Sequence, residues 1–427
     1  MKFFLFSLGC KVNGYENNAL RERFLLEGYS ETKDAKEADI IVINTCGVTS
    51  VADQKSRQHI RKFRRLSPNA VLAVMGCYSE VNAQEVETMG ADIIVGTSSR
   101  LKIVDYFKSL KAKQITSPIV DVKKSVRHER FEEMGQIAVS SWARAYLKIQ
   151  DGCDNFCSYC LIPTLRGNSR SREKDSVLLE TRNLVNQGYK EIVLTGIHIG
   201  KYGLDLDDGT YDLGSLVSDM LTQNPSLFRL RLGSLESKEV TPKIISLYKN
   251  SPALVSHLHV PLQSGSSSVL ERMHRPYDTD AFFKTIEAVR EVRPDVAITT
   301  DLIVGFPGES EEEWRETLSF VKKVRFSEIH VFPFSARKGT LAASLKDQID
   351  PKVKERRVQE LLALSKELRK EYESQFYKKE MDVLFEEYKD GYAYGHTANY
   401  LLVKIPSRRS LNGEVLKVEY TESTAAD

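Results

Sequence analysis

The sequence predicts an α/β protein in three parts: an N-terminal domain built on a parallel sheet, a central partial (β/α)6 barrel and a small C-terminal β-barrel. Ile/Val/Leu-rich runs alternate with helical patterns up to about residue 113, and a second, longer series of the same kind starts near residue 144. After residue 376 the helical periodicity gives way to short alternating strands. A chain of 427 residues is also too long for one hydrophobic core.

In the N-terminal series, three of the expected strands are followed by a cysteine. We expect strands over residues 2–7, 39–44, 71–75 and 92–95. Cys10, Cys46 and Cys77 follow the first three, and the carboxyl ends of parallel strands share the sheet edge where ligands bind, so these thiols can converge. Buried structural thiols are the alternative interpretation. The opening MKFFLFSLGC lacks a small-residue cleavage site, so we interpret it as a strand rather than a signal peptide.

The remaining segments are a linker, the barrel series and the β-rich end. Residues 114–143 are charged and aperiodic, which is typical of a linker. Barrel strands are expected over residues 145–149, 191–194, 228–232, 257–260, 297–303 and 328–332. Six such units are fewer than the usual eight, which indicates an open barrel. Asp350-Pro351 starts a long helix that closes the barrel domain. The expected domains are therefore 1–113, 144–376 and 377–427. The last of these should contain about five strands.

Composition limits the class of protein. Apolar residues make up 41% of the chain and charged residues 28%, which is ordinary for a globular protein. No apolar run approaches the roughly 20 residues that span a bilayer, so we expect no membrane partner. We expect a cytoplasmic protein, where cysteines more often bind metal than form disulfides. The net charge is only +2, so any nucleic-acid partner would have to be bound by local basic patches rather than by an overall positive field.

The most specific motif is a compact cysteine triplet. Cys153, Cys157 and Cys160 lie in the sequence GCDNFCSYC, directly after the first expected barrel strand. A structural zinc site or a ferredoxin cluster uses four protein ligands. Three thiolates on a cubane cluster would leave one iron open for the amino and carboxylate groups of S-adenosylmethionine. The alternative is a zinc loop completed by a distant fourth ligand.

Several motifs together resemble one known family. GCDNFCSYCLIP, SLGCKVN, NTCGVT, MGCY, LRGNSRSR and DLIVGFPGE are similar to the motifs of the methylthiotransferase family of radical S-adenosylmethionine enzymes. The resemblance covers essentially the whole chain and implies an α/β domain with a second three-cysteine cluster, a partial-barrel radical domain and a C-terminal RNA-binding TRAM β-barrel. SLGCKVN and the RSR of LRGNSRSR most resemble the branch that acts on N6-threonylcarbamoyladenosine beside the tRNA anticodon.

The resemblance implies roles for particular residues and two 4Fe-4S clusters. Cys153, Cys157 and Cys160 would hold the radical-generating cluster, and Cys10, Cys46 and Cys77 the auxiliary cluster that carries the transferred sulfur. The residues implied at the S-adenosylmethionine site are Tyr159 near the adenine, Gly196 near the methionine end, Glu236 near the ribose, and Asp301 and Gly305 on the fifth strand. Glu236 could instead be a solvated loop acid, and Gly305 a turn glycine.

Asparagines and histidines are weaker candidates. Asn13 and Asn44 flank the auxiliary cysteines and could donate hydrogen bonds to a cluster, although asparagine at a strand end is usually a turn former. His257 and His259 share one strand face, and we interpret them as hydrogen-bonded core or rim residues. His198 follows the Thr195-Gly196 turn and is the better functional candidate.

Three basic patches are candidates for RNA contact, and a solvated surface is the alternative for each. The first lies on an expected helix and the second borders the expected barrel mouth, while the third accompanies Tyr400 in the terminal β unit, where aromatic and basic side chains suit base stacking and phosphate contact. Their basic residues are Lys55, Arg61, Lys62 and Arg65; Arg166, Arg170 and Arg172; and Lys404, Arg408 and Arg409.

The resemblance implies an enzyme that adds a methylthio group to carbon 2 of a modified adenosine in tRNA. One S-adenosylmethionine would methylate the sulfur and a second would yield the radical. The reaction also needs an electron donor and a sulfur source, and we expect no DNA partner. An aromatic C–H offers no acidic proton, so acid–base catalysis alone would not suffice. The rival substrates are isopentenyladenosine in tRNA and a ribosomal protein. A rival of another class is a zinc-dependent RNA-binding protein without catalysis.

Overall fold

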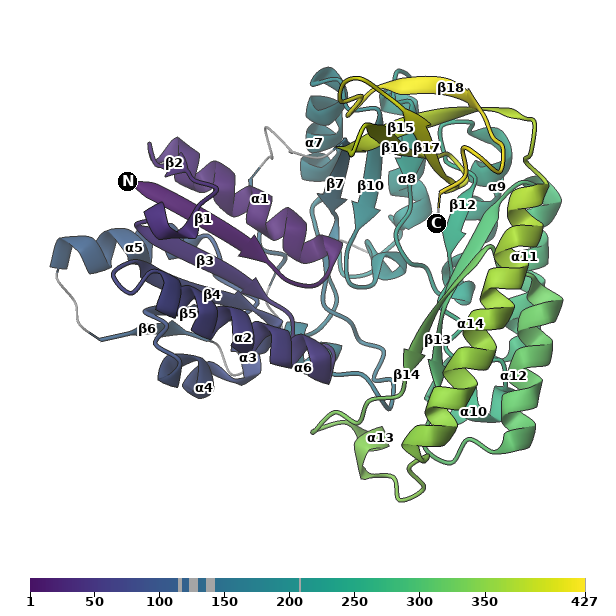
Figure 1. The fold of residues 1–427 in the computed structure, drawn as a ribbon, viewed down its shortest axis with the longest axis horizontal. Coiled ribbons are helices and arrows are strands. Elements are labelled where there is room, and N and C mark those ends of the chain that lie inside the picture. The colour runs from purple at the N-terminus through teal and green to yellow at the C-terminus, as the bar shows by residue number, and fades with distance from the viewer. Residues whose placement is uncertain (114–116, 123–129, 136–142, 207–208, 427) are drawn as a thin grey trace. The chain divides into compact units, whose positions relative to one another are not determined.

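The computed structural model describes residues 1–113, 117–122, 130–135, 143–206 and 209–426. The chain divides into two compact units, whose elements are drawn in Figure 1. Unit 1 comprises residues 1–139, 150–156 and 160–172. Unit 2 comprises residues 140–149, 157–159 and 173–427. The short loop with the cysteine triplet therefore contributes residues to both units.

Unit 1 is built on a six-stranded sheet in the order β2-β1-β3-β4-β5-β6, in which all neighbours are parallel. Its strands are β1 (Lys2–Ser7), β2 (Ser30–Glu31), β3 (Ile40–Thr45), β4 (Val71–Gly76), β5 (Ile93–Val95) and β6 (Ile119–Asp121). The four predicted strands are confirmed to within one residue at each end. The edge strands β2 and β6 are too short for a hydrophobic pattern to indicate them.

Helices cover both faces of this sheet, as continuous apolar strands require (Figure 1). They are α1 (Lys11–Leu26), η1 (Ala35–Glu37), α2 (Ser50–Leu66), α3 (Cys77–Val81), α4 (Ala83–Thr88) and α5 (Lys102–Lys113). Ile40 and Val42 pack on the face of α1 and α5, whereas Ile41 and Ile43 pack on the face of α2, α3 and α4. This alternation follows from the two-residue period of a strand.

The expected linker and domain boundary differ from the structure in one respect each. Strand β6 lies within the stretch 114–143, whose residues 114–116, 123–129 and 136–142 are outside the described residues. Residues 150–156 and 160–172, expected in the barrel domain, belong to unit 1. They form β8 (Gln150–Asp151), helix α6 (Ile162–Arg166) and β9 (Arg170–Ser171), with β8 and β9 antiparallel.

Unit 2 contains the expected partial barrel as two parallel three-stranded sheets, in the orders β7-β10-β11 and β12-β13-β14. Its strands are β7 (Arg144–Lys148), β10 (Glu191–Thr195), β11 (Arg229–Arg231), β12 (His257–His259), β13 (Ala297–Val304) and β14 (Glu328–Pro333). Leu230 forms an isolated parallel bridge with Leu254, just before β12. The described strands thus curve into an open barrel rather than a closed ring of eight.

The helices of unit 2 pack against the barrel strands around one large apolar core. They are α7 (Lys174–Asn186), η2 (Ile199–Lys201), α8 (Leu213–Gln223), η3 (Ser237–Glu239), α9 (Pro242–Asn250), α10 (Ser267–Arg272), α11 (Thr279–Val292), α12 (Glu311–Val324), α13 (Leu341–Ser344) and α14 (Pro351–Ser374). The predicted capping box of Ser310 and Glu313 is present at α12. Helix α14 starts at Pro351 and runs beside β14 (Figure 1).

The C-terminal segment of unit 2 is a four-stranded antiparallel sheet in the order β17-β16-β15-β18. Its strands are β15 (Glu380–Lys389), β16 (Tyr392–Thr397), β17 (Leu402–Pro406) and β18 (Val415–Glu419). A fifth strand was expected, but after β18 the described residues form only a single bridge between Val403 and Ala425. The sheet is therefore a curled half-barrel. None of the helices in the described residues is long and apolar enough to cross a membrane.

Candidate cluster sites

The dispersed cysteines lie together at one edge of the unit 1 sheet, as the strand spacing predicts. Cys10 is the N-cap of α1 and Cys77 is the first residue of α3. A Cβ on Gly9 would lie 2.8 Å from Cys46 Cβ, and one on Gly47 would lie 3.1 Å from the Cys77 carbonyl carbon. These close approaches bring the three cysteine-bearing turns into contact. The free thiols range from exposed in Cys10 to buried in Cys77.

These thiols are spaced more widely than a single zinc ion requires. Sulfurs around one tetrahedral zinc ion lie about 3.8 Å apart, given Zn–S bonds of about 2.3 Å. Among the described residues, the Sγ atoms of Cys10, Cys46 and Cys77 do not all lie within 4.8 Å of one another. Three thiols from three neighbouring turns are the donor set for a cubane iron–sulfur cluster that keeps one iron open. The residues present therefore fit such a cluster.

Burial keeps two of these thiols protonated before metal binds. It raises the pKa of Cys77 to about 11 and raises the pKa of Cys46, although Arg166 acts in the opposite direction on both. Because iron binds thiolates, loading of this site must release protons. A cluster would supply the positive charge that stabilises the thiolates inside the protein.

Arg166 lies at the centre of a buried polar network beside these cysteines. Its Nε donates to Cys77 Sγ at 3.3 Å, and its Nη2 donates to Asn13 Oδ1 at 2.7 Å. Its Nη1 donates to Glu16 at 2.9 Å and to Asp151 at 3.0 Å. Asn13 also accepts a 3.7 Å contact from Cys10 Sγ, so the asparagine orients both a thiol and the guanidinium rather than forming a turn alone.

A second buried arginine completes the network. Arg100 pairs with Glu16 at 3.1 Å, with Glu132, and with Asp151 at 3.5 Å. Asn44 donates to Glu16 and to the Asn13 carbonyl oxygen. The guanidinium groups thus neutralise buried carboxylates, which satisfies the requirement that buried charges be paired. Sequence reasoning missed Glu16 and Arg100, because nothing in their spacing links them to the cysteines.

The prediction that Arg166, Arg170 and Arg172 border an open mouth is not supported by their placement. All three side chains are buried. Arg170 donates to the carbonyl oxygens of residues 166 and 168, and Arg172 bonds Glu133 and Tyr15 Oη. The sequence alone does not distinguish arginines that bind RNA phosphates from arginines that pair with buried carboxylates.

The compact triplet lies on a loop between β8 and α6 whose sulfurs all receive hydrogen bonds. The amide of Asn155 donates to Cys153 Sγ at 3.4 Å, and that of Ile162 donates to Cys160 Sγ at 3.4 Å. In unit 2, Arg275 Nη1 donates to Cys157 Sγ at 3.2 Å. Such donors stabilise thiolate sulfur and tune the potential of iron–sulfur clusters. This loop therefore fits a cluster held by three thiolates.

Arg275 also connects Cys157 with the predicted ribose residue. Its guanidinium pairs with Glu236 at 2.8 Å and contacts the ring of Tyr277. Glu236 is the N-cap of η3, where it forms a capping box with Glu239. It is therefore a structured, partly buried carboxylate rather than a solvated loop acid. Arg275 follows Cys157 by more than one hundred residues, and no motif in the sequence indicates it.

Of the other predicted cofactor residues, Tyr159 lies on the cysteine loop, and the rest lie inside barrel strands or directly after them. Gly196 directly follows β10, and Tyr159 packs with Val269, Met273 and Phe306 of unit 2. Gly305 directly follows β13 with φ of 73°, and a Cβ there would lie 2.5 Å from Lys354 Cγ. Its close neighbour is thus helix α14, which supports the turn interpretation of this glycine.

Asp301 lies on β13 between two histidines. His259 Nε2 is 3.4 Å and His330 Nδ1 is 3.0 Å from its carboxylate oxygens. Burial opposes ionisation, but hydrogen bonds from both histidines outweigh it and lower the Asp301 pKa. Hydrogen bonds to Asp301 and Glu328 raise the pKa of His330 to about 10. Asp301 is thus a paired carboxylate.

His257 and His259 are hydrogen-bonded, in line with their interpretation as core or rim residues, whereas His198 was the better functional candidate. His257 and His259 both bond Thr299 Oγ1, at 3.2 and 2.9 Å. His198 is buried and lies 2.5 Å from Glu239. His198, Glu236 and Glu239 bring their ligand atoms within 4.8 Å of one another. Because Glu236 is already paired with Arg275, this group is a structural network around η3.

Tyr400 is not available for base stacking. Its ring lies against His257 and His396, with centroid distances of 4.8 and 4.6 Å. Arg144 and Arg231 pack over the same ring at 5.3 and 4.8 Å. The tyrosine is therefore a packing residue between the C-terminal sheet and the barrel strands. Lys404, Arg408 and Arg409 remain at least partly exposed, with Arg409 paired to Glu414.

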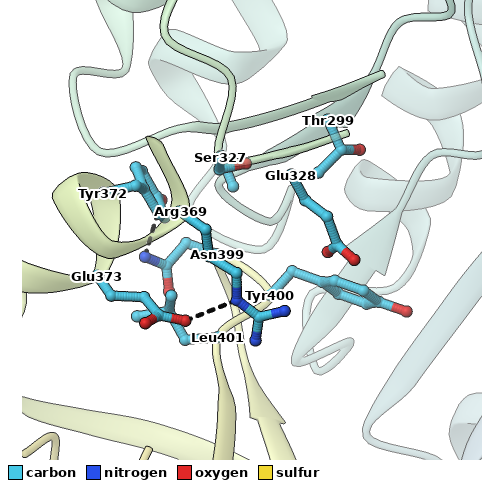
Figure 2. Close-up of a pocket in the computed structure, with 10 residues that line it drawn as sticks. Thr299, Ser327, Glu328, Arg369, Tyr372, Glu373, Asn399, Tyr400 and Leu401 are labelled. Atoms are coloured by element: carbon cyan, nitrogen blue, oxygen red, sulfur yellow. Dashed lines mark hydrogen bonds and ion pairs between the residues drawn. The ribbon is translucent and has the colours of Figure 1, made fainter. Parts of the chain in front are cut away.

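A small pocket lies beside this tyrosine (Figure 2). It is lined from the barrel by Thr299 and Glu328 and from α14 by Tyr372, which accepts a hydrogen bond from Asn399 at 3.0 Å. Barrel enzymes bind substrates at the carboxyl ends of the strands. Glu328 is the first residue of β14, so this pocket lies at the amino end of that strand, where the barrel meets the C-terminal segment.

The exposed basic helix is confirmed. Lys55, Arg61, Lys62 and Arg65 all lie exposed on α2, whose apolar residues Ile60 and Phe63 are buried. The helix thus has a cationic outer face, as its pattern predicts.

Comparison with known proteins matches the two halves of this arrangement separately. The uncharacterized protein family UPF0004 matches residues 2–96, and the Radical SAM superfamily matches residues 147–321. The solved radical S-adenosylmethionine methyltransferase TsrM from Kitasatospora setae shares the fold, with a TM-score of 0.60 over 80% of this chain and 74% of that chain. At 16% identity this likeness concerns the fold alone. Fold and motifs define a radical S-adenosylmethionine enzyme.

Relatives of known activity identify the family within that class. The threonylcarbamoyladenosine tRNA methylthiotransferase MtaB of Bacillus subtilis is 42% identical over 97% of this chain and 92% of its own length. The tRNA-2-methylthio-N(6)-dimethylallyladenosine synthase of Bacillus pumilus is 32% identical over 99% of this chain and 84% of its own length. This chain belongs to the tRNA methylthiotransferase family of radical S-adenosylmethionine enzymes.

Proposed function

We propose that this enzyme adds a methylthio group to carbon 2 of N6-threonylcarbamoyladenosine in tRNA. The observation that carries the substrate assignment is the 42% identity with the relative named for threonylcarbamoyladenosine, against 32% with the relative named for dimethylallyladenosine. The SLGCKVN and LRGNSRSR motifs support the same branch. The tRNA substrate, an electron donor and a sulfur source are the partners that this reaction needs.

The residues proposed to hold the cofactors are the two cysteine sets. Cys153, Cys157 and Cys160 would bind one 4Fe-4S cluster with S-adenosylmethionine, and Cys10, Cys46 and Cys77 would bind the other. When bound, these groups supply the radical and the methylated sulfur. The expected domains remain our proposal for the division of labour: 1–113 for the auxiliary cluster, 144–376 for radical chemistry and 377–427 for RNA, with 114–143 as linker.

The protein itself would hold these groups in place and stabilise the thiolate sulfurs. Hydrogen bonds from Asn155, Ile162 and Arg275 to the triplet sulfurs support this role. We propose that Tyr159, Gly196, Glu236, Asp301 and Gly305 line the S-adenosylmethionine site. For RNA contact we retain Lys404, Arg408 and Arg409. For Arg166, Arg170 and Arg172, burial supports a structural role instead.

Nucleoside mass analysis tests the proposed function. The full chain is expressed in a bacterial strain that lacks methylthiotransferases, and its tRNA is digested and compared with tRNA from the strain carrying Cys153→Ala or Cys77→Ala. We expect the 2-methylthio derivative of threonylcarbamoyladenosine with the unchanged chain and neither variant to form it. A methylthio group on isopentenyladenosine instead would assign the rival substrate. A colourless, zinc-containing protein after anaerobic purification would refute the enzyme.

A further inference from the structure

Within unit 1, a single buried side chain contacts elements of both cysteine sets. Arg166 donates from Nε to Cys77 Sγ and from Nη1 to Asp151, the residue two positions before Cys153. The side chain is fully buried, as is that of Glu16, which accepts from the same Nη1. These residues come from the first half of α1, the start of α3, the end of β8 and the end of α6.

The path from Asp151 to Cys153 is continuous. The Asp151 carboxylate accepts from the Gly152 amide at 2.8 Å, and the Cys153 amide donates to the Gly167 carbonyl oxygen at 3.0 Å. Gly167 is the residue next to Arg166. The backbone on either side of Cys153 is therefore held by the arginine's carboxylate partner and by the arginine's own chain neighbour.

The charges of this network balance only when Arg166 is included. Arg100, Arg166 and Arg170 face Glu16, Asp151 and the partly exposed Glu132, so three positive charges meet three negative ones. A buried carboxylate without a partner is strongly unfavourable, so the guanidinium cannot leave without a compensating change. Its Nε, however, is not needed for this balance, and it points at the Cys77 sulfur.

We propose that Arg166 is a positioning residue that joins the two cluster sites: it holds the Cys77 sulfur and, through Asp151, the backbone that carries Cys153. This inference rests on the proposed function, since it assumes that both cysteine sets bind clusters. A hydrogen-bonded cation at a ligand sulfur stabilises the more negative, reduced form of a cluster and so raises its reduction potential. Partners of ligands typically change site affinity by about 10–100-fold.

Two full-length backgrounds separate the two contacts. In the first, Cys153, Cys157 and Cys160 are replaced by Ala, leaving only the auxiliary site. In the second, Cys10, Cys46 and Cys77 are replaced by Ala, leaving only the radical site. Each background receives Arg166→Met together with Glu16→Gln, which removes one charge of each sign and keeps the network neutral. The matched control is Arg172→Met, which removes a buried arginine of the same segment without a sulfur contact.

The readouts are iron content, reduction potential and S-adenosylmethionine affinity. In the first background we expect the Arg166 variant to lower the auxiliary-cluster potential in an anaerobic titration followed by electron paramagnetic resonance. In the second we expect S-adenosylmethionine to bind about tenfold more weakly. Arg172→Met should change neither. An Arg166 variant that matches Arg172→Met in either readout overturns the inference.

Iron content separates the two hypotheses. If the unsubstituted backgrounds bind no iron–sulfur cluster, the proposed function fails. If they bind about four irons each and the Arg166 variant behaves like the control, the function stands and the role of Arg166 is refuted.

Discussion

Glu191 shows how much one buried carboxylate can organise in unit 2. It pairs with Arg231 at 2.7 Å, with Arg144 at 3.3 Å and with Arg229 at 3.6 Å. Burial alone would raise its pKa, but Arg231 and Arg144 outweigh burial and lower the pKa to about 2. Arg229 and Arg231 also donate to carbonyl oxygens of the C-terminal sheet. Glu191 is thus the shared counter-charge where that sheet meets the barrel strands.

We therefore predict that Glu191→Gln destabilises the protein by about 3–5 kcal/mol, because it leaves three buried guanidinium groups without their common acid. Urea denaturation of the purified variant measures this. The control is Glu380→Gln, which breaks only the exposed pair with Lys417 and should leave the midpoint almost unchanged. Since the folded pKa of Glu191 is depressed, its stabilisation is lost as pH falls from about 4.5 towards 2. Equal midpoints for both variants would refute this assignment.

At the scale of elements, the turn from β8 into the cysteine loop depends on a glycine. Gly152 has φ of 74°, a left-handed conformation that L side chains rarely adopt. A Cβ there would lie 1.9 Å from the Asn168 carbonyl oxygen, which is backbone and cannot rotate away. The loop and the α6–β9 connection can approach this closely only because residue 152 has no side chain.

We predict that Gly152→Ala lowers both stability and the iron bound by Cys153, Cys157 and Cys160. The matched control is Gly188→Ala, where φ is 90° but no atom lies within 4 Å of an added Cβ. The control should lose only about 1 kcal/mol of its free energy of unfolding, because of added backbone strain, and it should keep its iron. Thermal unfolding and iron analysis of both variants measure the difference. Normal iron content in Gly152→Ala would show that the turn tolerates a side chain.

At the scale of the whole molecule, the balance of charge determines how RNA can bind. With 61 basic and 59 acidic residues, the chain has almost no overall attraction for a polyanion. Several of its arginines are buried in ion pairs with acidic side chains, as the networks of Arg166 and Glu191 show. Among the described residues, exposed cations gather on α2 and in the turn after β17.

We predict that Arg61→Glu with Arg65→Glu weakens tRNA binding and makes it less dependent on salt, since each phosphate contact contributes about one unit to the slope of log K against log salt. Filter binding or anisotropy over a range of salt concentrations measures this. Lys284→Glu with Lys322→Glu is the control, because it changes the charge equally on exposed positions of α11 and α12. Equal losses in both variants would mean that only net charge matters.

Much of this architecture can be predicted from the sequence because it depends on the local pattern of apolar and capping residues. The strands over residues 2–7 and 71–75 and the capping box of α12 follow from period and cap chemistry, and they are confirmed. The convergence of Cys10, Cys46 and Cys77 also follows, since a repeating strand–helix unit returns to the same sheet edge. Short edge strands such as β2 carry too few residues to show a pattern.

The order of the domains, the two cysteine sets and the family can thus be read from the residue pattern. The role of the arginines follows only from their packing in the folded chain. Arg166, Arg170 and Arg172 look like a surface patch, yet they are buried because Glu16, Asp151 and Glu133 neutralise them. Tyr400 looks like a stacking platform, yet Arg144 and Arg231 cover it. The spacing of residues along the chain predicts secondary structure and the number of cysteine ligands. It does not predict which acid neutralises a given arginine, because that acid is distant in the sequence.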